Sequence, residues 1–265
     1  MRYDIHQADN PNNDRFVLSK GHAAPLLYAA WAEAGIIEVD DLLNLRKIDS
    51  DLEGHPTPRL PWVDVATGSL GQGLSVGLGM AINGKYLDQL DYRVYVLMGD
   101  GETAEGGVWE AAALAALYKL DNLVGIVDVN GIGQSQQTMY GFDVDSYCRR
   151  FESFGWNTIS IDGHDIEQII SAFIQAHSIK EQPTMIVAKT FKGQGVSFTE
   201  NVDGWHGKAI PEEQLEQALK ELGPVVDVPV PIQAPTVSKL QSQSVSKIDP
   251  PKYQIGNEIA TRSGY

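Results

Sequence analysis

Two short runs of β-branched and aliphatic residues, 92–98 and 123–129, constrain the fold of this chain most strongly. Each run ends in a glycine-containing turn, at residues 99–101 after the first and 130–131 after the second. An alanine-rich stretch between them, residues 103–118, has the length of a crossover helix. The three segments together predict a βαβ unit with buried parallel strands.

The same alternation continues toward the carboxyl end of the chain. Helices are predicted at 24–34, 145–154, 166–177 and 211–222, and strands at 157–161 and 183–189. The polar first twenty residues are predicted to form a loop. We therefore expect an α/β domain, a doubly wound parallel sheet with helices on both faces, over residues 1–223. Residues 224–256, which include a stretch rich in Pro, Val, Ser and Gln, are expected to form a linker.

Composition limits the classes of function. Lys and Arg number 20 and Asp and Glu number 35, so the formal net charge of −15 argues against a large basic surface for nucleic acid. Cys148 is the only cysteine, which excludes an intramolecular disulfide and favours a reducing compartment. The first residues lack the apolar core of a signal peptide, and the apolar stretch 63–80 is interrupted by Asp64 and several glycines. We expect a cytoplasmic protein with no membrane partner.

Polar residues follow both of the best predicted strands. If the strands are neighbours, the Asp100 carboxylate and the Asn130 amide oxygen meet at one edge of the sheet. With a backbone carbonyl from the turn that ends at Ile132, these oxygen donors suit Mg²⁺ or Ca²⁺. The alternative is that Asp100 caps a helix and Asn130 is an ordinary turn residue.

Glycine and histidine supply the other candidates. The glycine-rich segment 68–79 does not have the spacing of a dinucleotide fingerprint, and close packing of an apolar helix explains it as well. Three histidines, His22, His55 and His206, lie in glycine-containing loops, where they could serve proton transfer to a polar substrate. A single loop histidine is more often a solvated or capping group. No nucleophile elbow, zinc-protease motif or Walker loop is found in the sequence.

Taken together, the motifs resemble those of transketolases. The Gly-Asp-Gly turn at Asp100 followed by Asn130 is similar to the thiamine diphosphate motif. Further matching segments are residues 14–23, 51–56, 66–73 and 188–193. The similarity covers residues 14–222 and is strongest to animal-type transketolases.

The resemblance implies a role for each candidate residue. It implies that Asp100, Asn130 and the carbonyl group of Ile132 hold the Mg²⁺ or Ca²⁺ ion that bridges the diphosphate. Contacts with the cofactor are implied for a larger set, namely His22, Gly68, Ser69, Leu70, Gly101, Glu102, Asn130, Lys192 and His206. Contacts with the phosphorylated sugar are implied for Lys20, His22, His55 and His206, of which the three histidines are also the implied catalytic residues.

The implied reaction transfers a two-carbon ketol unit from a ketose phosphate to an aldose phosphate in the pentose phosphate pathway. Xylulose 5-phosphate, ribose 5-phosphate and erythrose 4-phosphate are the implied substrates, with thiamine diphosphate as the group that performs the difficult chemistry. The family also implies a homodimer, with Glu105 and Glu110 at its interface. These two side chains could equally be ordinary surface acids.

The chain departs from the family pattern at both ends. An amino-terminal helix with a Ser-Gly-His-Pro type motif has no counterpart before Met1, and residues 257–265 resemble only the start of the pyrimidine-binding domain. We therefore expect a diphosphate-binding domain truncated at both ends and inactive in isolation. The alternatives are a catalytically inert binding or dimerisation module, and the large subunit of a split transketolase that needs a partner carrying the pyrimidine domain.

Overall fold

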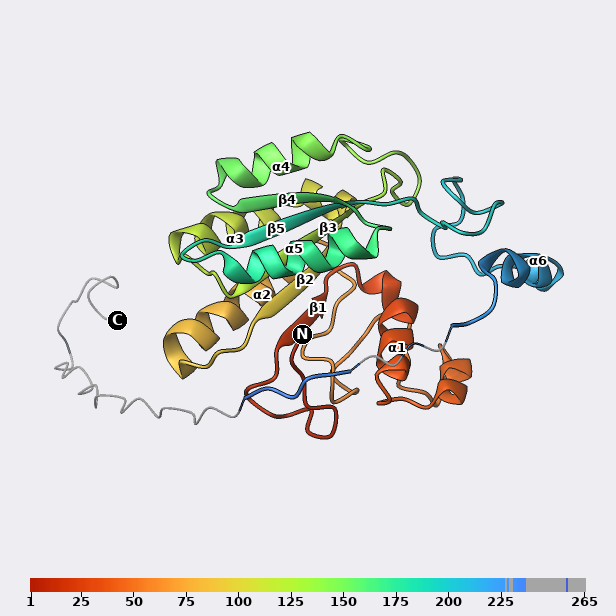
Figure 1. Ribbon diagram of the computed structural model, residues 1–265, viewed down its shortest axis with the longest axis horizontal. Helices are drawn as coiled ribbons and strands as arrows, with labels where there is room; N and C mark the ends of the chain where they lie inside the picture. The colour runs from red at the N-terminus through yellow and green to blue at the C-terminus, as the bar shows by residue number, and fades with distance from the viewer. Residues whose placement is uncertain (227, 229–230, 237–255, 257–265) are drawn as a thin grey trace.

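The computed structural model describes residues 1–226, 228, 231–236 and 256, and its centre is a five-stranded parallel sheet with the strand order β1-β2-β3-β5-β4 (Figure 1). The predicted α/β fold is confirmed. The elements in chain order are β1 (Arg15–Leu18), α1 (Ala24–Glu33), α2 (Gly73–Ile82), β2 (Val94–Gly99), α3 (Gly106–Leu117), β3 (Leu123–Val129), α4 (Val144–Ser153), β4 (Asn157–Asp162), α5 (Ile166–Ser178), β5 (Thr184–Lys189) and α6 (Glu212–Leu222). Short 3-10 helices lie at η1 (Gly21–Ala23), η2 (Val39–Asn44) and η4 (Asp100–Ala104), and a π-helical turn lies at η3 (Asn83–Asp88).

Helices cover both faces of the sheet. The main core joins one sheet face to α2, α3 and α4, and it includes Val127 and Val129 of β3. Val124 of β3 belongs to the core on the other face, which α5 covers, and a third cluster places α1 on that same side. In Figure 1, α5 is drawn in front of the strands, α3 lies behind them, and α6 stands apart from the sheet. Because successive strand residues point to opposite faces, near-continuous apolar runs are what such two-sided burial requires.

The central strands agree closely with the sequence. The strand predicted at 123–129 is β3 with the same bounds, and it pairs with β2 from Val94↔Leu123 to Gly99↔Asp128. The strand predicted at 92–98 begins two residues later. Its start is displaced because the Arg93 amide donates to the Asp14 carboxylate at 2.9 Å instead of joining the sheet.

The prediction of a loop for the first twenty residues was wrong for β1. Strand β1 pairs in parallel with β2 through the register Arg15↔Val94 to Leu18↔Leu97. It has only four residues and no polar-apolar alternation, so the sequence carries no periodic signal for it. The side chain of Asp14 fixes its start, since this buried carboxylate accepts from the Arg2 amide at 2.6 Å as well as from Arg93.

The start of the helix predicted at 103–118 was also misplaced. The chain first forms η4 and then an extended residue, Glu105, before α3 begins at Gly106. Local side-chain bonds explain the difference, because Thr103 Oγ1 donates to the Asp100 carbonyl and Glu102 accepts from the Gly99 amide. Such bonds compete with a regular helical turn.

The glycine-rich segment allows α2 to pack closely against β2 and against Ser19, which follows β1. A Cβ atom added at Gly77 would lie 2.4 Å from a methyl group of Val96 on β2, and one at Gly73 would lie 2.3 Å from Ser19. Gly79 faces open space. Only glycine permits this approach of the helix to β2, so the packing interpretation of the segment is supported.

Most of the predicted linker, namely residues 227, 229–230 and 237–255, lies outside the described residues, as do all of residues 257–265. Of the described part, Gln233 pairs in parallel with Arg2, and its carbonyl accepts from the Tyr3 amide at 2.8 Å. Ile232 packs on the cluster that contains Tyr3. This short piece therefore lies against the beginning of the chain.

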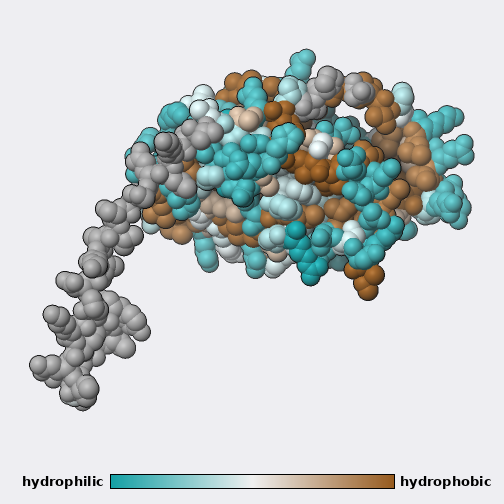
Figure 2. Space-filling view, turned by 90° about the horizontal axis from the view of Figure 1, so that it is seen from below, coloured by the Kyte–Doolittle hydropathy of each residue, from teal (hydrophilic) through white to brown (hydrophobic). Residues whose placement is uncertain are grey.

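The surface seen from below mixes hydrophilic residues with hydrophobic ones (Figure 2). Within the described residues, no helix has the length and apolar character needed to cross a membrane. Exposed apolar side chains do occur along α5, where Ile166, Ile170 and Ile174 follow one another at helical spacing.

Two glycine substitutions in α2 test the packing argument. Gly77→Ala is expected to lower the free energy of unfolding by about 1–3 kcal/mol, because the added methyl group overlaps Val96. Gly79→Ala, in the same helix but facing open space, is expected to raise it by about 0.5–1 kcal/mol. Urea unfolding of the two variants measures both effects, and equal destabilisation by both would contradict the assignment.

Candidate functional site

A cleft of about 1070 Å³ lies at the carboxyl ends of β2, β3 and β5. One part of its lining is polar and comes from the loops that follow the strands. Another part is apolar and comes from the sheet and α5, with Leu97, Ile126, Ile186 and Phe173 among its residues. This is the edge where open α/β sheets bind ligands.

The cleft brings together nearly all of the residues predicted from the sequence. Those that line it are Lys20, His22, His55, Gly68, Leu70, Asp100, Gly101, Glu102, Asn130, Ile132, Lys192 and His206. Ser69 is exposed and is the one predicted site residue that is not among the lining residues. Glu105 and Glu110 are exposed at the start and on the surface of α3.

Asp100 follows β2 and is only 4% exposed. One of its oxygens accepts from the Gly131 amide at 2.9 Å and from Thr138 Oγ1 at 2.8 Å, and the other accepts from the Gly101 amide at 2.9 Å. Burial raises the pKa of this carboxyl above its ordinary value, although the three hydrogen bonds oppose the shift. All three donors are neutral, so a cation is the kind of ligand that would compensate the charge of Asp100.

Asn130 follows β3 and faces the same cleft. Its Oδ1 accepts from the Ile132 amide at 3.1 Å, and its Nδ2 donates to Asp128 at 3.3 Å. Gly131, between Asn130 and Ile132, has a φ of 72°, which lets the chain turn back at this point. Among the described residues, no group of three or more His, Cys, Asp or Glu side chains is placed to hold a metal. The Asp100 carboxylate and the Asn130 amide oxygen come from residues that line the cleft, and hard oxygen ligands of this kind fit Mg²⁺ or Ca²⁺.

A basic cluster lies beside these oxygens. Lys192 Nζ is 2.8 Å from His206 Nδ1, and the rings of His22 and His206 are 4.8 Å apart. Because a lysine ammonium group only donates, Nδ1 of His206 is the acceptor and the proton of the neutral ring is on Nε2. Burial, followed by the charge of Lys192 and then of Lys20, lowers the pKa of His206.

Burial also lowers the pKa of His22 to about 4, with further contributions from Lys20, His206, Lys192 and His55. The pKa of Lys192 is lowered by burial and by Lys20. A set of nitrogen groups that oppose one another's protonation is a site prepared for an anion, because a phosphate would relieve their repulsion.

His55 reaches the cleft because of Gly68. Gly68 has a φ of 139°, and a Cβ atom placed there would lie 3.0 Å from the His55 ring. The imidazole therefore packs directly on the backbone of the glycine loop.

Glu102 connects three segments of the site. Its side chain is 1% exposed, and Oε1 accepts from Ser19 Oγ at 2.6 Å and from the Gly71 amide at 2.9 Å. Oε2 accepts from the Gly99 amide at 2.9 Å. The loops after β1, before α2 and after β2 are thus joined by one buried carboxylate. Sequence reasoning placed Glu102 at the cofactor but did not foresee this role.

Two polar cleft residues, Asp128 and Thr190, were not foreseen, nor was Thr138, which bonds to Asp100 from outside the lining. Asp128 in β3 accepts from Lys20, from Thr190 Oγ1 and from Asn130, while Thr138 donates to Asp100. A signal for Asp128 was present in the sequence, since alternate residues of a strand share a face and Asp128 stands two positions before Asn130. Thr138 and Thr190 carry no comparable pattern.

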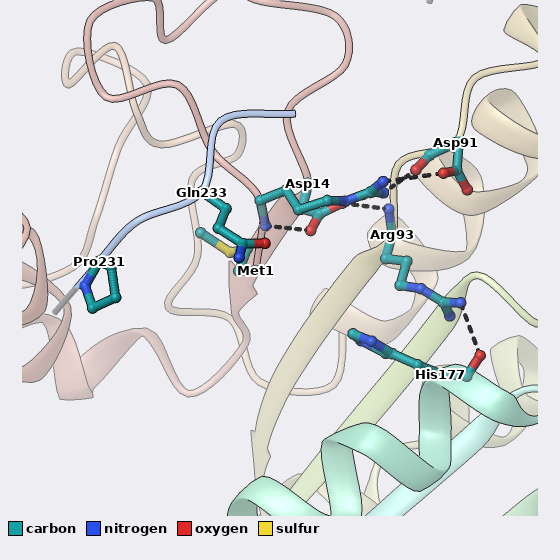
Figure 3. Close-up of a pocket in the computed structure, with 8 residues that line it drawn as sticks. Met1, Asp14, Asp91, Arg93, His177, Pro231 and Gln233 are labelled. Carbon is teal, nitrogen blue, oxygen red and sulfur yellow. Dashed lines mark hydrogen bonds and ion pairs between the residues drawn. The ribbon is translucent and has the colours of Figure 1, made fainter. Parts of the chain in front are cut away.

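A second pocket lies near the amino ends of β1 and β2, and none of the predicted site residues lines it (Figure 3). Its charged groups are largely satisfied by one another and by the backbone. Arg2 bridges Asp14 and Asp91, and Arg93 donates to the carbonyl of His177 at 3.2 Å. These bonds join the beginning of the chain to β2 and α5, so the pocket is a structural junction.

One family of known proteins matches most of this chain. A family model described as "Transketolase, thiamine diphosphate binding domain" matches residues 1–249. The chain belongs to this family. The resemblance drawn from the sequence motifs is therefore confirmed.

The transketolase relatives are longer than this chain. Over its whole length, the chain is 52% identical to transketolase from Mus musculus, of which it covers 43%. It is 50% identical to transketolase-like protein 2 from Homo sapiens and again covers 43% of that protein. The chain thus spans less than half the length of these curated relatives.

Solved transketolase structures share the fold. The crystal structure of transketolase from Campylobacter jejuni superposes with a TM-score of 0.78 at 35% identity, over 84% of this chain and 36% of that one. Transketolase from Pichia stipitis in complex with sedoheptulose 7-phosphate also gives 0.78, at 31% identity, over 84% of this chain and 34% of that one.

The role of Glu102 in this transketolase-family domain can be tested by an isosteric change. Glu102→Gln replaces one acceptor oxygen by an NH₂ group that must face a backbone or hydroxyl donor. We expect the free energy of unfolding to fall by about 1–3 kcal/mol, measured by urea unfolding. Glu216→Gln, at an exposed position of α6, is the matched control and is expected to change it by less than about 0.5 kcal/mol. An unchanged stability of Glu102→Gln would refute the anchoring role.

The lowered pKa of His22 predicts a defined pH dependence. The unfolded chain takes up this proton near the ordinary value of 6.5, whereas the folded chain takes it up near 4. The stability associated with neutral His22 is therefore complete above about pH 6.5 and is lost as the pH falls toward 4. NMR titration should give a midpoint near 4 for this ring.

His22→Asn should flatten the dependence of stability on pH in this interval. His6→Asn, at an exposed histidine, controls for the loss of one imidazole. A midpoint near 6.5 for His22 would show that its surroundings do not oppose its protonation.

Proposed function

We propose that this chain forms the diphosphate- and metal-binding half of a transketolase active site. The proposed reaction transfers a two-carbon ketol unit from a ketose phosphate to an aldose phosphate, with xylulose 5-phosphate, ribose 5-phosphate and erythrose 4-phosphate as substrates. The observation that carries the proposal is the meeting of the oxygen donors of Asp100 and Asn130 with the basic cluster in one cleft, in a chain of this family. Thiamine diphosphate, when bound, supplies the nucleophilic carbon and the electron sink for this chemistry.

The oxygen donors would hold the divalent ion. Asp100, Asn130 and the carbonyl of Ile132 provide charge and hard oxygen ligands, and diphosphate oxygens commonly complete such a shell. The proposed metal is Mg²⁺, with Ca²⁺ as the alternative. Support comes from the three neutral hydrogen-bond donors to the Asp100 carboxylate and from the adjacent placement of Asn130.

The nitrogen groups would face the anionic parts of the ligands. We assign Lys192, with Gly68, Leu70 and Gly101, to the cofactor and Lys20 and His55 to the sugar phosphate. His22 and His206 are assigned to both ligands. Ser69 and Glu102 remain predicted cofactor contacts. Ser69 is exposed, whereas the Glu102 carboxylate accepts hydrogen bonds from three segments of the chain.

The histidines would move protons. Their lowered pKa values keep His22 and His206 neutral at neutral pH, and the neutral His22 imidazole can accept a proton from a sugar hydroxyl group. The bond from Lys192 holds His206 in one tautomer, so its Nε2–H is the group available to a substrate oxygen.

We further propose that the active assembly is a homodimer in the cytoplasm, working in the pentose phosphate pathway. The single cysteine supports a reducing compartment. Exposed carboxylates of Glu105 and Glu110 on α3 are the groups proposed to lie at the dimer interface.

Calorimetric titration with thiamine diphosphate, with and without Mg²⁺, tests the metal-dependent binding. We expect binding that requires the ion, and an affinity about 10- to 100-fold lower for Asp100→Asn, because a charged interaction is lost. Asp121→Asn is the control, since the Asp121 carboxylate is paired with Lys85 and precedes the amino end of β3, at the other end of the strand from the cleft. Binding that is indifferent to both the ion and Asp100 would contradict the proposal.

A further inference from the structure

Asp128 occupies the centre of the polar end of the cleft. It stands on β3 between Gly99 of β2 and Ala188 of β5 in the sheet register. Its Oδ2 accepts from Lys20 Nζ, and its Oδ1 accepts from Thr190 Oγ1. One carboxylate therefore connects the segments that follow β1 and β5 to the end of β3.

The same carboxylate also bonds to a proposed metal ligand. Asn130 Nδ2 donates to Asp128 Oδ2 at 3.3 Å. A carboxylate accepts but cannot donate, so only the NH₂ group of the Asn130 amide can face it. The amide oxygen is thereby turned the other way, where it accepts from the Ile132 amide at 3.1 Å.

The Asp128 carboxylate is surrounded by donors. Besides the Asn130 amide, the Lys20 ammonium group and the Thr190 hydroxyl group both donate to it. With three donors directed at it, the carboxylate acts toward Asn130 as an acceptor.

We propose that Asp128 is a positioning residue, which orients the Asn130 amide so that Oδ1 is presented to the divalent ion and Nδ2 is kept away from it. The inference rests on the proposed function for the identity of the ion, but the orientation itself is a property of this chain alone. Partners that orient metal ligands typically change metal affinity by about 10- to 100-fold when removed.

The chain contains a matched comparison. Asp121 pairs with Lys85 at 2.8 Å, and the side chains of the two pairs have similar exposure, 19% for Asp121 and 21% for Asp128. Asp121 also accepts from the backbone, at the Glu181 amide. Asp121→Asn therefore removes a comparable lysine–aspartate pair without touching the cleft.

The first experiment measures the metal requirement. At a fixed concentration of thiamine diphosphate, the Mg²⁺ concentration for half-maximal binding is determined by calorimetry. Asp128→Asn is expected to raise it by about 10- to 100-fold, while Asp121→Asn leaves it unchanged. In an Asn130→Ala background, Asp128→Asn should add no further increase, because its effect passes through Asn130.

Lys20→Met separates orientation from charge pairing. It removes the ammonium partner but leaves the bond between Asp128 and Asn130, so its effect on the Mg²⁺ requirement should be smaller than that of Asp128→Asn. If Lys20→Met reproduces the whole effect, or if the effects of Asp128→Asn and Asn130→Ala multiply, the positioning role is refuted.

The second experiment needs no cofactor. Amide hydrogen exchange of the chain alone reports the bond from Ile132 to Asn130 Oδ1, and the neighbouring Gly131 amide, which donates to Asp100, is an internal reference. Asp128→Asn should speed exchange at Ile132 by about tenfold, the order expected for the loss of one hydrogen bond, with Gly131 unchanged. Asp121→Asn should change neither.

The two experiments distinguish the two ideas. Failure of the unaltered chain to bind thiamine diphosphate with Mg²⁺ would count against the proposed function, and the exchange data would still decide whether Asp128 orients Asn130. Normal exchange at Ile132 in Asp128→Asn would overturn the positioning role even if the cofactor binds.

Discussion

The buried carboxylate of Glu102 is the constraint on which the site depends. It accepts three hydrogen bonds from Ser19, Gly71 and Gly99, which belong to three separate segments of the chain. A carboxylate at 1% exposure is stable only when its oxygens are satisfied, so the three segments must arrive together. The placement of Lys20, next to Ser19, and of Asp100, next to Gly99, follows from that requirement.

The sequence predicts the fold where burial imposes a strong local pattern. Strand β3 carries apolar residues on both faces and was located with its bounds, because both sides are covered by helices. Strand β1 was missed because its pairing with β2 depends on Asp14, whose partners Arg2 and Arg93 are far apart in the chain. Such long-range side-chain bonds leave no periodicity to detect.

The candidate site shows the same division. Asp100 and Asn130 could be predicted to meet, because each follows a strand and the two strands are one βαβ unit apart. Asp128 lies two positions before Asn130 at the same end of β3, so its presence in the cleft was also encoded, but its partners Lys20 and Thr190 come from other strand ends. What such a carboxylate bonds to is decided by tertiary structure and not by spacing.

The apolar part of the cleft strengthens the electrostatic interactions within it. Leu97, Ile126 and Ile186 line the same cavity as the lysines and carboxylates, and hydrocarbon surfaces polarise far less than water does. The interaction between two charges grows in inverse proportion to the effective dielectric constant around them. The sheet therefore lowers the effective dielectric constant of the cleft as well as supporting its loops. A charged group that binds beside Lys20 or Asp100 interacts with them more strongly than it would on an open surface.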